Sequence, residues 1–185
     1  MTLDRTAALA LVEKYADKDI TVRHLISVEG VMRGLAGALG GEQDRWGLTG
    51  LFHDLDYDRT QGDLERHGYQ TVEWLQEEGF TDKEVLNAIL AHRFESYRTD
   101  LMSKAIVNAD AVAGLLVATA LVRPEKAVGM SVKSVKKKLK ERSFAPGVER
   151  DEIRNVEESI GLPMDEFVGV SIEGLQSVAK EIDLA

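Results

Sequence analysis

Apolar residues recur at steps of three and four positions along nearly the whole chain. This spacing places them on one face of an α-helix, whereas a half-buried strand would alternate apolar and polar residues. We find no alternating run that is bounded by hairpin turns. The pattern therefore predicts an all-α protein, with helices over 3–16, 20–39, 43–56, 64–78, 83–92, 101–122, 132–142, 150–160 and 165–182.

The spacing of helix breakers divides the chain into three parts. Arg123-Pro124 closes the long apolar helix, and the Ala-Pro-Gly run at 145–147 precedes the last helices. We expect a single domain over 1–185, with a core over about 20–122, a basic helical segment over about 123–142 and C-terminal helices over about 148–183. Apolar residues of the last part can pack on the core, which we expect, or form a homodimer surface: Phe167, Val170, Leu175, Val178 and Ile182.

Composition narrows the chemistry that the chain can perform. Its 185 residues are 44% hydrophobic and 30% charged, which suits one globular domain with a sizeable core. The chain has no cysteine, which excludes disulfides, cysteine-bound zinc, iron–sulfur clusters and thiol catalysis. Any metal ion must therefore bind to histidine, aspartate or glutamate.

Charge is spread unevenly along the chain. The formal net charge of −9 argues against nucleic acid or an anionic membrane as the main partner. The segment 123–142 nevertheless carries a net +6, so that the remainder carries −15. This segment is either a solvated helix face, with Val132, Val135 and Leu139 turned inward, or a basic lip for a phosphorylated substrate or a nucleic acid backbone.

The N-terminal sequence does not resemble a signal peptide, because acidic residues surround its short apolar run. The longest uncharged stretch, 111–122, is too short to cross a bilayer. We expect a cytoplasmic protein with no membrane partner.

All four histidines lie in the first half of the chain, at positions 24, 53, 67 and 92. His24 shares a helical stripe with Ile20, Val28 and Leu35, so it faces the core. Such a histidine is either a hydrogen-bonded core residue or a metal ligand.

Two aspartates accompany these histidines. Asp54 directly follows His53, and adjacent side chains on a helix diverge by about 100°, so both reach one ion only in a wide cleft or at a helix end. Asp110 lies on a mostly apolar helix, where a buried carboxylate needs a cation, either an arginine or a metal. If these groups converge, imidazole and carboxylate ligands suit Zn, Mn, Fe, Co or Ni, and Mg where waters complete the shell.

The ordered set His24, His53-Asp54, Asp110 resembles the signature of the HD-domain superfamily of metal-dependent phosphohydrolases. The match covers roughly residues 20–122, and its local contexts are VRHLISV, LTGLFHDLDY and IVNADAV. The resemblance implies an HD-type helical bundle in which these four residues bind a divalent ion. Asp54 would also be the catalytic residue, orienting a water molecule or bridging to a second ion.

His67 and His92 extend the resemblance to the two-metal branches of the superfamily and to the di-iron inositol oxygenases. They are then further metal ligands or phosphate contacts, and the chain binds one or two ions. Some features depart from the family pattern. Asp56 stands where many members have glycine, no Gly-Tyr-Pro motif follows His92, and Tyr57 stands where some one-metal nucleotidases have a catalytic glutamate.

The resemblance implies a phosphohydrolase that cleaves a phosphate mono- or diester by metal-activated water. The expected partner is a phosphorylated small molecule such as a nucleotide, and not a nucleic acid. The alternatives are a di-iron oxygenase of the HD type and a non-catalytic metal-binding HD module, which Asp56 would favour. Basic side chains near the motif are candidates for phosphate contacts: Arg59, Arg93, Arg98 and Lys104.

Overall fold

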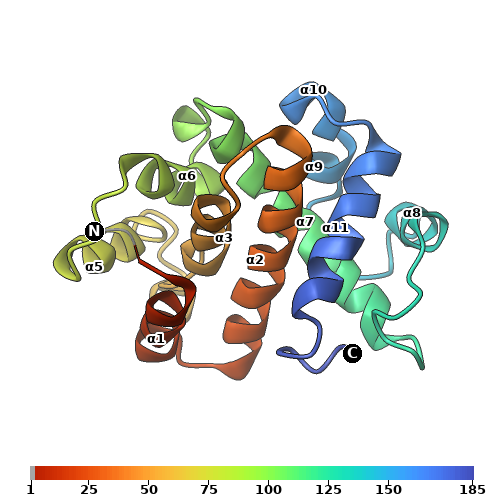
Figure 1. Ribbon diagram of the computed structural model, residues 1–185, viewed down its shortest axis with the longest axis horizontal. Coiled ribbons are helices and arrows are strands. Elements are labelled where there is room, and N and C mark those ends of the chain that lie inside the picture. Colours follow the sequence, from red (N-terminus) through yellow and green to blue (C-terminus); the bar gives the residue numbers. More distant parts are fainter. Residues whose placement is uncertain (1–2) are drawn as a thin grey trace.

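The computed structural model describes residues 3–185, which form helices and no strand (Figure 1). The all-α prediction is thus confirmed. The elements are α1 (Arg5–Tyr15), α2 (Asp19–Leu39), α3 (Gln43–Phe52), α4 (Tyr57–Thr60), α5 (Tyr69–Glu77), α6 (Lys83–Arg93), the 3-10 turn η1 (Glu95–Tyr97), α7 (Leu101–Leu121), α8 (Val132–Lys140), α9 (Arg150–Arg154), α10 (Val156–Ile160) and α11 (Met164–Val178).

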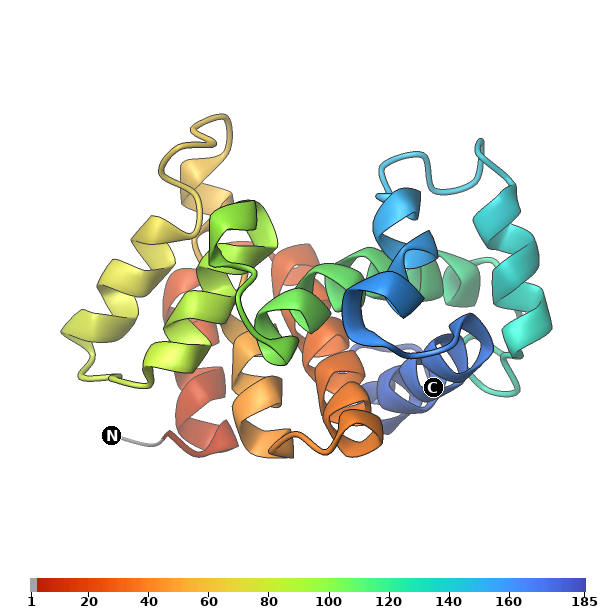
Figure 2. The same ribbon diagram turned by 90° about the horizontal axis from the view of Figure 1, so that it is seen from above.

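Helix α2 is the centre of the bundle. Helices α3 and α11 flank it on either side, and α7 crosses behind it (Figure 1). Figure 2 shows α7 running across the molecule, from the end that holds α5 and α6 to the end that holds α8, α9 and α10. Two long helices in contact, α2 and α7, therefore join the two ends of the fold.

The contact between α2 and α11 depends on two glycines. A Cβ atom on Gly30 would lie 2.4 Å from the carbonyl oxygen of Gly174, and one on Gly174 would lie 2.4 Å from the carbonyl oxygen of Gly30. Only glycine allows two helix backbones to approach this closely. The apolar residues Phe167, Leu175 and Val178 of α11 are buried in the same core, as expected from the sequence.

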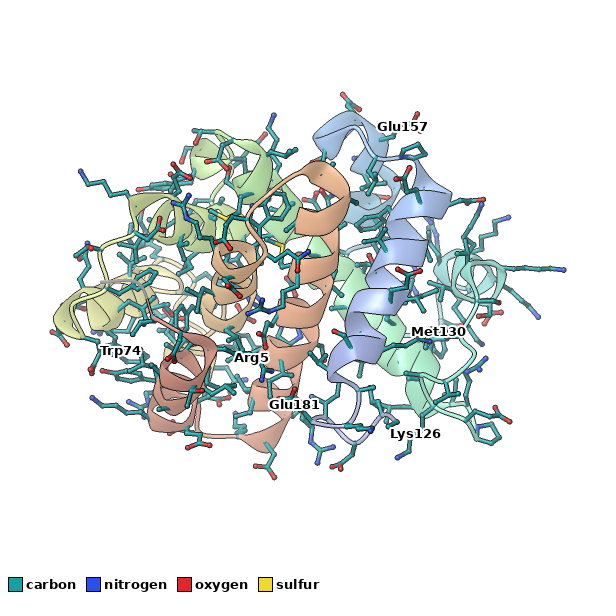
Figure 3. The ribbon with its side chains drawn as sticks, viewed as in Figure 1. Arg5, Trp74, Lys126, Met130, Glu157 and Glu181 are labelled. Atoms are coloured by element: carbon teal, nitrogen blue, oxygen red, sulfur yellow. The ribbon has the colours of Figure 1, made fainter. Side chains whose placement is uncertain are left out.

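A buried carboxylate on α2 joins both ends of the chain to this core. Glu29 is fully buried and accepts hydrogen bonds from Arg5 at 2.7 and 2.9 Å and from Arg33 at 2.9 Å. Arg5 also contacts Glu181 at 2.9 Å, so α1 and the chain after α11 meet on α2 (Figure 3). Two guanidinium groups compensate the buried charge of Glu29.

Helix α7 is long and apolar enough to cross a membrane by length and composition. In this fold it is a core helix, and 67% of its apolar window is buried inside the protein. It packs against α2 and α6 on one part of its length and against α8, α9 and α10 on another.

The basic helix α8 has a single apolar face. Val135 is fully buried and Leu139 nearly so, while its lysines lie toward solvent. Lys136 contacts Asp165 of α11, and Lys138 pairs with Glu141 at 2.8 Å. This arrangement agrees with the solvated-face interpretation of the segment.

Four predicted helices either divide or differ by more than two residues at one end, and one of them, predicted over 165–182, ends at Val178. The helix predicted over 43–56 ends at Phe52, and the one predicted over 64–78 begins only at Tyr69. Asp56 joins the two regions, because its carboxylate accepts the backbone N–H groups of Gly68 and Thr71 and its own backbone N–H donates to the hydroxyl of Thr71. Gly68 has a φ of 84°, which is incompatible with a helix. The helix predicted over 150–160 divides at Asn155 into α9 and α10.

Candidate metal centre

The structure brings together all six His and Asp side chains that the sequence singled out as metal ligands. They come from five different parts of the bundle. His24 lies on α2 and Asp110 on α7, whereas His53 and Asp54 follow the end of α3. His67 lies in the loop before α5, and His92 lies in the last turn of α6.

Three of these residues form a first group around His24. The Nε2 atom of His24 lies 3.2 Å from Nε2 of His53 and 3.2 Å from Oδ1 of Asp110. The Nε2 atom of His53 lies 3.8 Å from the same Asp110 oxygen. Two imidazoles and one carboxylate thus face a common point.

His67 and His92 form a second group on the other side of Asp54. Their Nε2 atoms are 3.0 Å apart, and each lies 3.1 Å from Oδ1 of Asp54. The other carboxylate oxygen, Oδ2, lies 3.7 Å from His24 and 3.8 Å from His53. The single carboxylate of Asp54 therefore presents one oxygen to each group.

These distances have the size expected of a coordination shell. Nitrogen and oxygen ligands bind Zn-like ions at about 2.0 to 2.2 Å, so two ligands of one ion stand about 2.8 to 3.6 Å apart. The ligand atoms of His24, His53 and Asp54 all lie within 4.8 Å of one another, and so do those of Asp54, His67 and His92. Each group has room for one cation between its members.

The hydrogen bonds of the Nδ1 atoms of His53 and His92 show why a cation fits between the Nε2 atoms. Nδ1 of His53 donates to the carbonyl oxygen of Gly50 at 2.9 Å, and Nδ1 of His92 donates to that of Ile89 at 2.5 Å. A carbonyl oxygen only accepts, so Nδ1 carries the proton and Nε2 of a neutral ring offers a lone pair. Lone pairs that converge at about 3 Å are stabilised by a positive ion between them.

The close approach of α3 to α2 positions His53 beside His24. A Cβ atom on Gly50 would lie 2.7 Å from backbone atoms of Glu29. The absent side chain lets α3 lie directly on α2, and its last turn then delivers His53 to the centre. His53 is fully buried there.

Asp56 is a residue of the site that the sequence analysis missed. Its carboxylate is fully buried, accepts the Nδ1 proton of His67 at 2.7 Å, and accepts backbone N–H groups of Gly68 at 2.7 Å and Thr71 at 3.0 Å. It therefore fixes the His67 ring and the loop that carries it. The only sequence signal for this role is an aspartate two positions after His-Asp, where many members of the family have glycine.

The charges of the site keep its carboxylates ionised. Burial would raise the pKa of Asp110, but hydrogen bonds and charge from His24 and His53 hold it well below its ordinary value. The pKa of Asp54 is likewise held well below its ordinary value against burial, by His53, His67 and His92. Burial lowers the pKa of His67, but Asp54 and Asp56 raise it to about 9.

A cavity of about 440 Å³ opens beside the first group. Its wall includes His24, His92 and Asp110 together with Arg93 and Arg98. The remaining wall comes from α7 and from the chain around α9, whose polar members are Glu149 and Glu152. The C-terminal part of the chain thus helps to enclose the site.

The four basic residues proposed as phosphate contacts divide into two pairs. Arg93 and Arg98 line the cavity, where Arg98 also donates to Glu152 at 3.3 Å and to the carbonyl oxygen of Ala91 at 3.2 Å. Arg93 is exposed and makes no ion pair with any residue in 3–185. It is therefore available to an anionic ligand.

The other pair does not line this cavity. Arg59 donates two hydrogen bonds of 3.1 Å to Asp17 and lies over the ring of Trp74 at 5.2 Å, so its charge is already engaged. Lys104 is exposed in the first turns of α7, on a different face from Asp110. Contrary to expectation, the structure does not place Arg59 or Lys104 in the wall of this cavity.

Comparison with known proteins gives one match. The family model of the HD domain matches residues 21–121, more than half of the chain. No curated protein and no solved structure matches the chain. The matched segment contains all six side chains of the metal centre.

Proposed function

Because the chain belongs to the HD domain family, we propose that it is a metal-dependent phosphohydrolase that cleaves a phosphate mono- or diester. One observation carries the proposal. Asp54 presents its two oxygens to two separate groups of imidazoles, next to a cavity that also holds Arg93 and Arg98. Ligands for cations and donors for a phosphate thus face the same space.

His24, His53, Asp54 and Asp110 would hold one divalent ion, and His67 and His92 a second one with Asp54. Bound there, such ions supply a polarised phosphoryl oxygen and a water molecule of lowered pKa. The arginines would bind the remaining phosphate oxygens by charge-assisted hydrogen bonds. In the reaction, water adds its oxygen to phosphorus, the bond from phosphorus to the ester oxygen breaks, and the alcohol leaves with a proton.

Hydrogen bonding at Asp56 bears on the non-catalytic alternative. The sequence favoured an inert metal module only through the presence of Asp56 in place of glycine. Asp56 instead positions His67, one of the proposed ligands. A residue that orients a ligand supports a complete second group.

Metal analysis with activity assays tests the proposal. The purified protein is reloaded with Mn, Fe, Zn, Co, Ni or Mg, and hydrolysis of a panel of phosphoesters is measured under air and under nitrogen, as phosphate released from monoesters and as alcohol released from diesters. We expect metal-dependent hydrolysis that does not need oxygen, and its loss in Asp54→Ala. Lys104→Ala, with a side chain outside the cavity, is the control.

Two results would contradict the proposal. Oxygen-dependent turnover of a polyol or phosphonate would assign the site to a di-iron oxygenase. A protein that binds metal but converts no phosphoester in the panel would assign it to the non-catalytic class.

A further inference from the structure

A second cavity, of about 530 Å³, lies beside the metal centre. Its lining residues come from the first turns of α2, the last turns of α7 and the C-terminal residues 182–184. Its lining is mainly apolar, with Ile20 from α2, with Val117, Ala118 and Leu121 from α7, and with Leu184 from the tail.

This second cavity adjoins the first. Both are lined by His24 and by Gly114. Along α7 the positions 110, 114, 117, 118 and 121 form one helical stripe, so the wall runs from the proposed ligand Asp110 to the exposed end of the helix. Gly114 has no side chain to separate the two spaces.

The polar side chains of the second cavity are mostly engaged with one another. Arg23 pairs with Asp183 at 2.7 Å and donates to the carbonyl oxygen of Ile182 at 3.3 Å. The hydroxyl of Ser27 donates to the backbone oxygen of Arg23 at 2.6 Å. The other polar side chains of the lining are the exposed Asp19, at the first residue of α2, and the proposed ligand His24, which leaves Asp19 to bind the hydroxyls of a sugar or the edge of a base.

The mouth of the cavity exposes large apolar side chains. Ile20 is 74% exposed and Leu121 is 69% exposed. An apolar ligand that covers these residues would remove their surface from water, which is favourable at about 25 cal/mol per Å². The lining and the mouth therefore both favour an apolar occupant.

We propose that the second cavity binds the organic part of the substrate, and that this part is an alkyl or aryl group rather than a nucleoside. The inference rests on the proposed function, because it places the phosphate at the metal centre and the organic group next to it. A cavity of roughly 150 Å³ holds a benzene ring. The space between α2 and α7 thus accommodates a group considerably larger than one ring.

A series of alkylphosphonates tests this inference, because these compounds carry the charged head and are not hydrolysed. Binding to the metal-loaded protein is measured by calorimetry from methyl- to octylphosphonate. If the chain enters the second cavity, affinity rises about three- to fourfold for each added methylene that is buried. An affinity that is independent of chain length, or a nucleoside monophosphate that binds more tightly than octylphosphonate, would overturn the inference.

A matched pair of variants tests whether the dependence of affinity on chain length arises in the second cavity. Val117→Gln places an amide in the lining, and we expect it to abolish the dependence on chain length. Val128→Gln changes a valine that is 59% exposed and outside both cavities, and it should retain the dependence. Methylphosphonate, which is too short to reach Val117, shows in the same proteins that the metal centre is intact.

Methyl NMR separates this inference from the proposed function. Octylphosphonate should shift the methyl signals of Ile20, Val117 and Leu121, whereas methylphosphonate should not. If neither compound binds through the metal centre, the proposed function fails. The shifts induced by octylphosphonate still show in that case whether the second cavity binds an alkyl chain. The inference would be rejected if octylphosphonate caused no such shifts. It would also be rejected if the same signals shifted with protein concentration in the absence of ligand, because a second copy of the chain would then fill the cavity.

Discussion

The Nδ1 atom of His67 donates a 2.7 Å hydrogen bond to Oδ1 of Asp56, a carboxylate that is fully buried. The other oxygen of Asp56 accepts the backbone N–H groups of Gly68 and Thr71. One side chain thus sets the tautomer of the histidine and the conformation of its loop. The Nε2 atom of His67 is thereby left to face Asp54.

Replacing Asp56 should therefore weaken the second group selectively. In Asp56→Asn we expect the affinity for the second ion to fall about 10- to 100-fold, the usual effect of losing such a partner, while the first ion stays bound. Competition with a chelator measures both affinities. Asp165→Asn, at an exposed aspartate on α11, is the control, and two ions bound with unchanged affinity in Asp56→Asn would refute the role.

The two groups of ligands predict different metal contents for histidine variants. His67→Ala and His92→Ala each remove one imidazole from the second group, so we expect about one ion per chain. His53→Ala removes a ligand of the first group instead and should leave the second filled. Elemental analysis after reloading with excess Mn measures the content.

A different result would change the assignment of the second group. If the unmodified protein binds a single ion in excess Mn, and both His67→Ala and His92→Ala keep it, these histidines contact substrate or support the structure. The one-metal phosphohydrolase would then be the remaining form of the proposal.

The arginines at the cavity predict an effect on substrate binding. Arg93→Ala and Arg98→Ala each remove a charge-assisted hydrogen bond of about 1.5 to 3 kcal/mol, so kcat/KM should fall roughly 10- to 100-fold with metal content unchanged. Steady-state kinetics on the best phosphoester of the panel measures this. Lys104→Ala should match the unmodified protein, and equal losses in Lys104→Ala and Arg93→Ala would show that net charge alone is responsible.

Asp58 predicts a pH dependence of stability. Burial alone would raise its pKa, but hydrogen bonds from Thr21, Lys18 and backbone N–H groups hold that pKa below its ordinary value. A carboxyl whose pKa is lower in the folded state stabilises the fold above its unfolded pKa, near 3.9, and this contribution is lost as pH falls through the folded value.

The variant Asp58→Asn tests this dependence. We expect it to lower the free energy of unfolding by about 1 to 3 kcal/mol at pH 7, because hydrogen bonds to a charged group are lost. The difference from the unmodified protein should shrink toward pH 3. Urea unfolding at several pH values measures it, and a difference that stays constant from pH 7 to pH 3 would contradict the assignment.

Much of the fold and of the candidate site follows from sequence. Helical periodicity predicts α2, α6 and α7 closely, because apolar spacing is the direct trace of a buried helix face. The His and Asp residues are recognisable because a carboxylate such as Asp110 on an apolar helix needs a cation. That these residues converge on one site was expected from the family resemblance alone, because no local sequence pattern shows which distant residues meet.

The features of the fold and of the site that the sequence does not predict depend on contacts between residues that are distant in sequence. The loops around His53 and His67 follow from hydrogen bonds to Asp56, whose partners are 11 to 15 positions away. Arg59 looked like a phosphate contact, because its engagement with Asp17 and Trp74 is visible only in three dimensions. The contribution of 147–152 to the cavity depends on the packing of α9 on α7.

That contribution has a consequence for how such a protein can diversify. The proposed metal ligands all lie within 21–121, whereas Gly147, Val148, Glu149 and Glu152 form their part of the wall from outside the matched segment. One part of the cavity wall is thus encoded outside the stretch that carries the proposed ion ligands. Mutations in the later stretch can reshape this part of the wall while the proposed ligands of the ion remain unaltered.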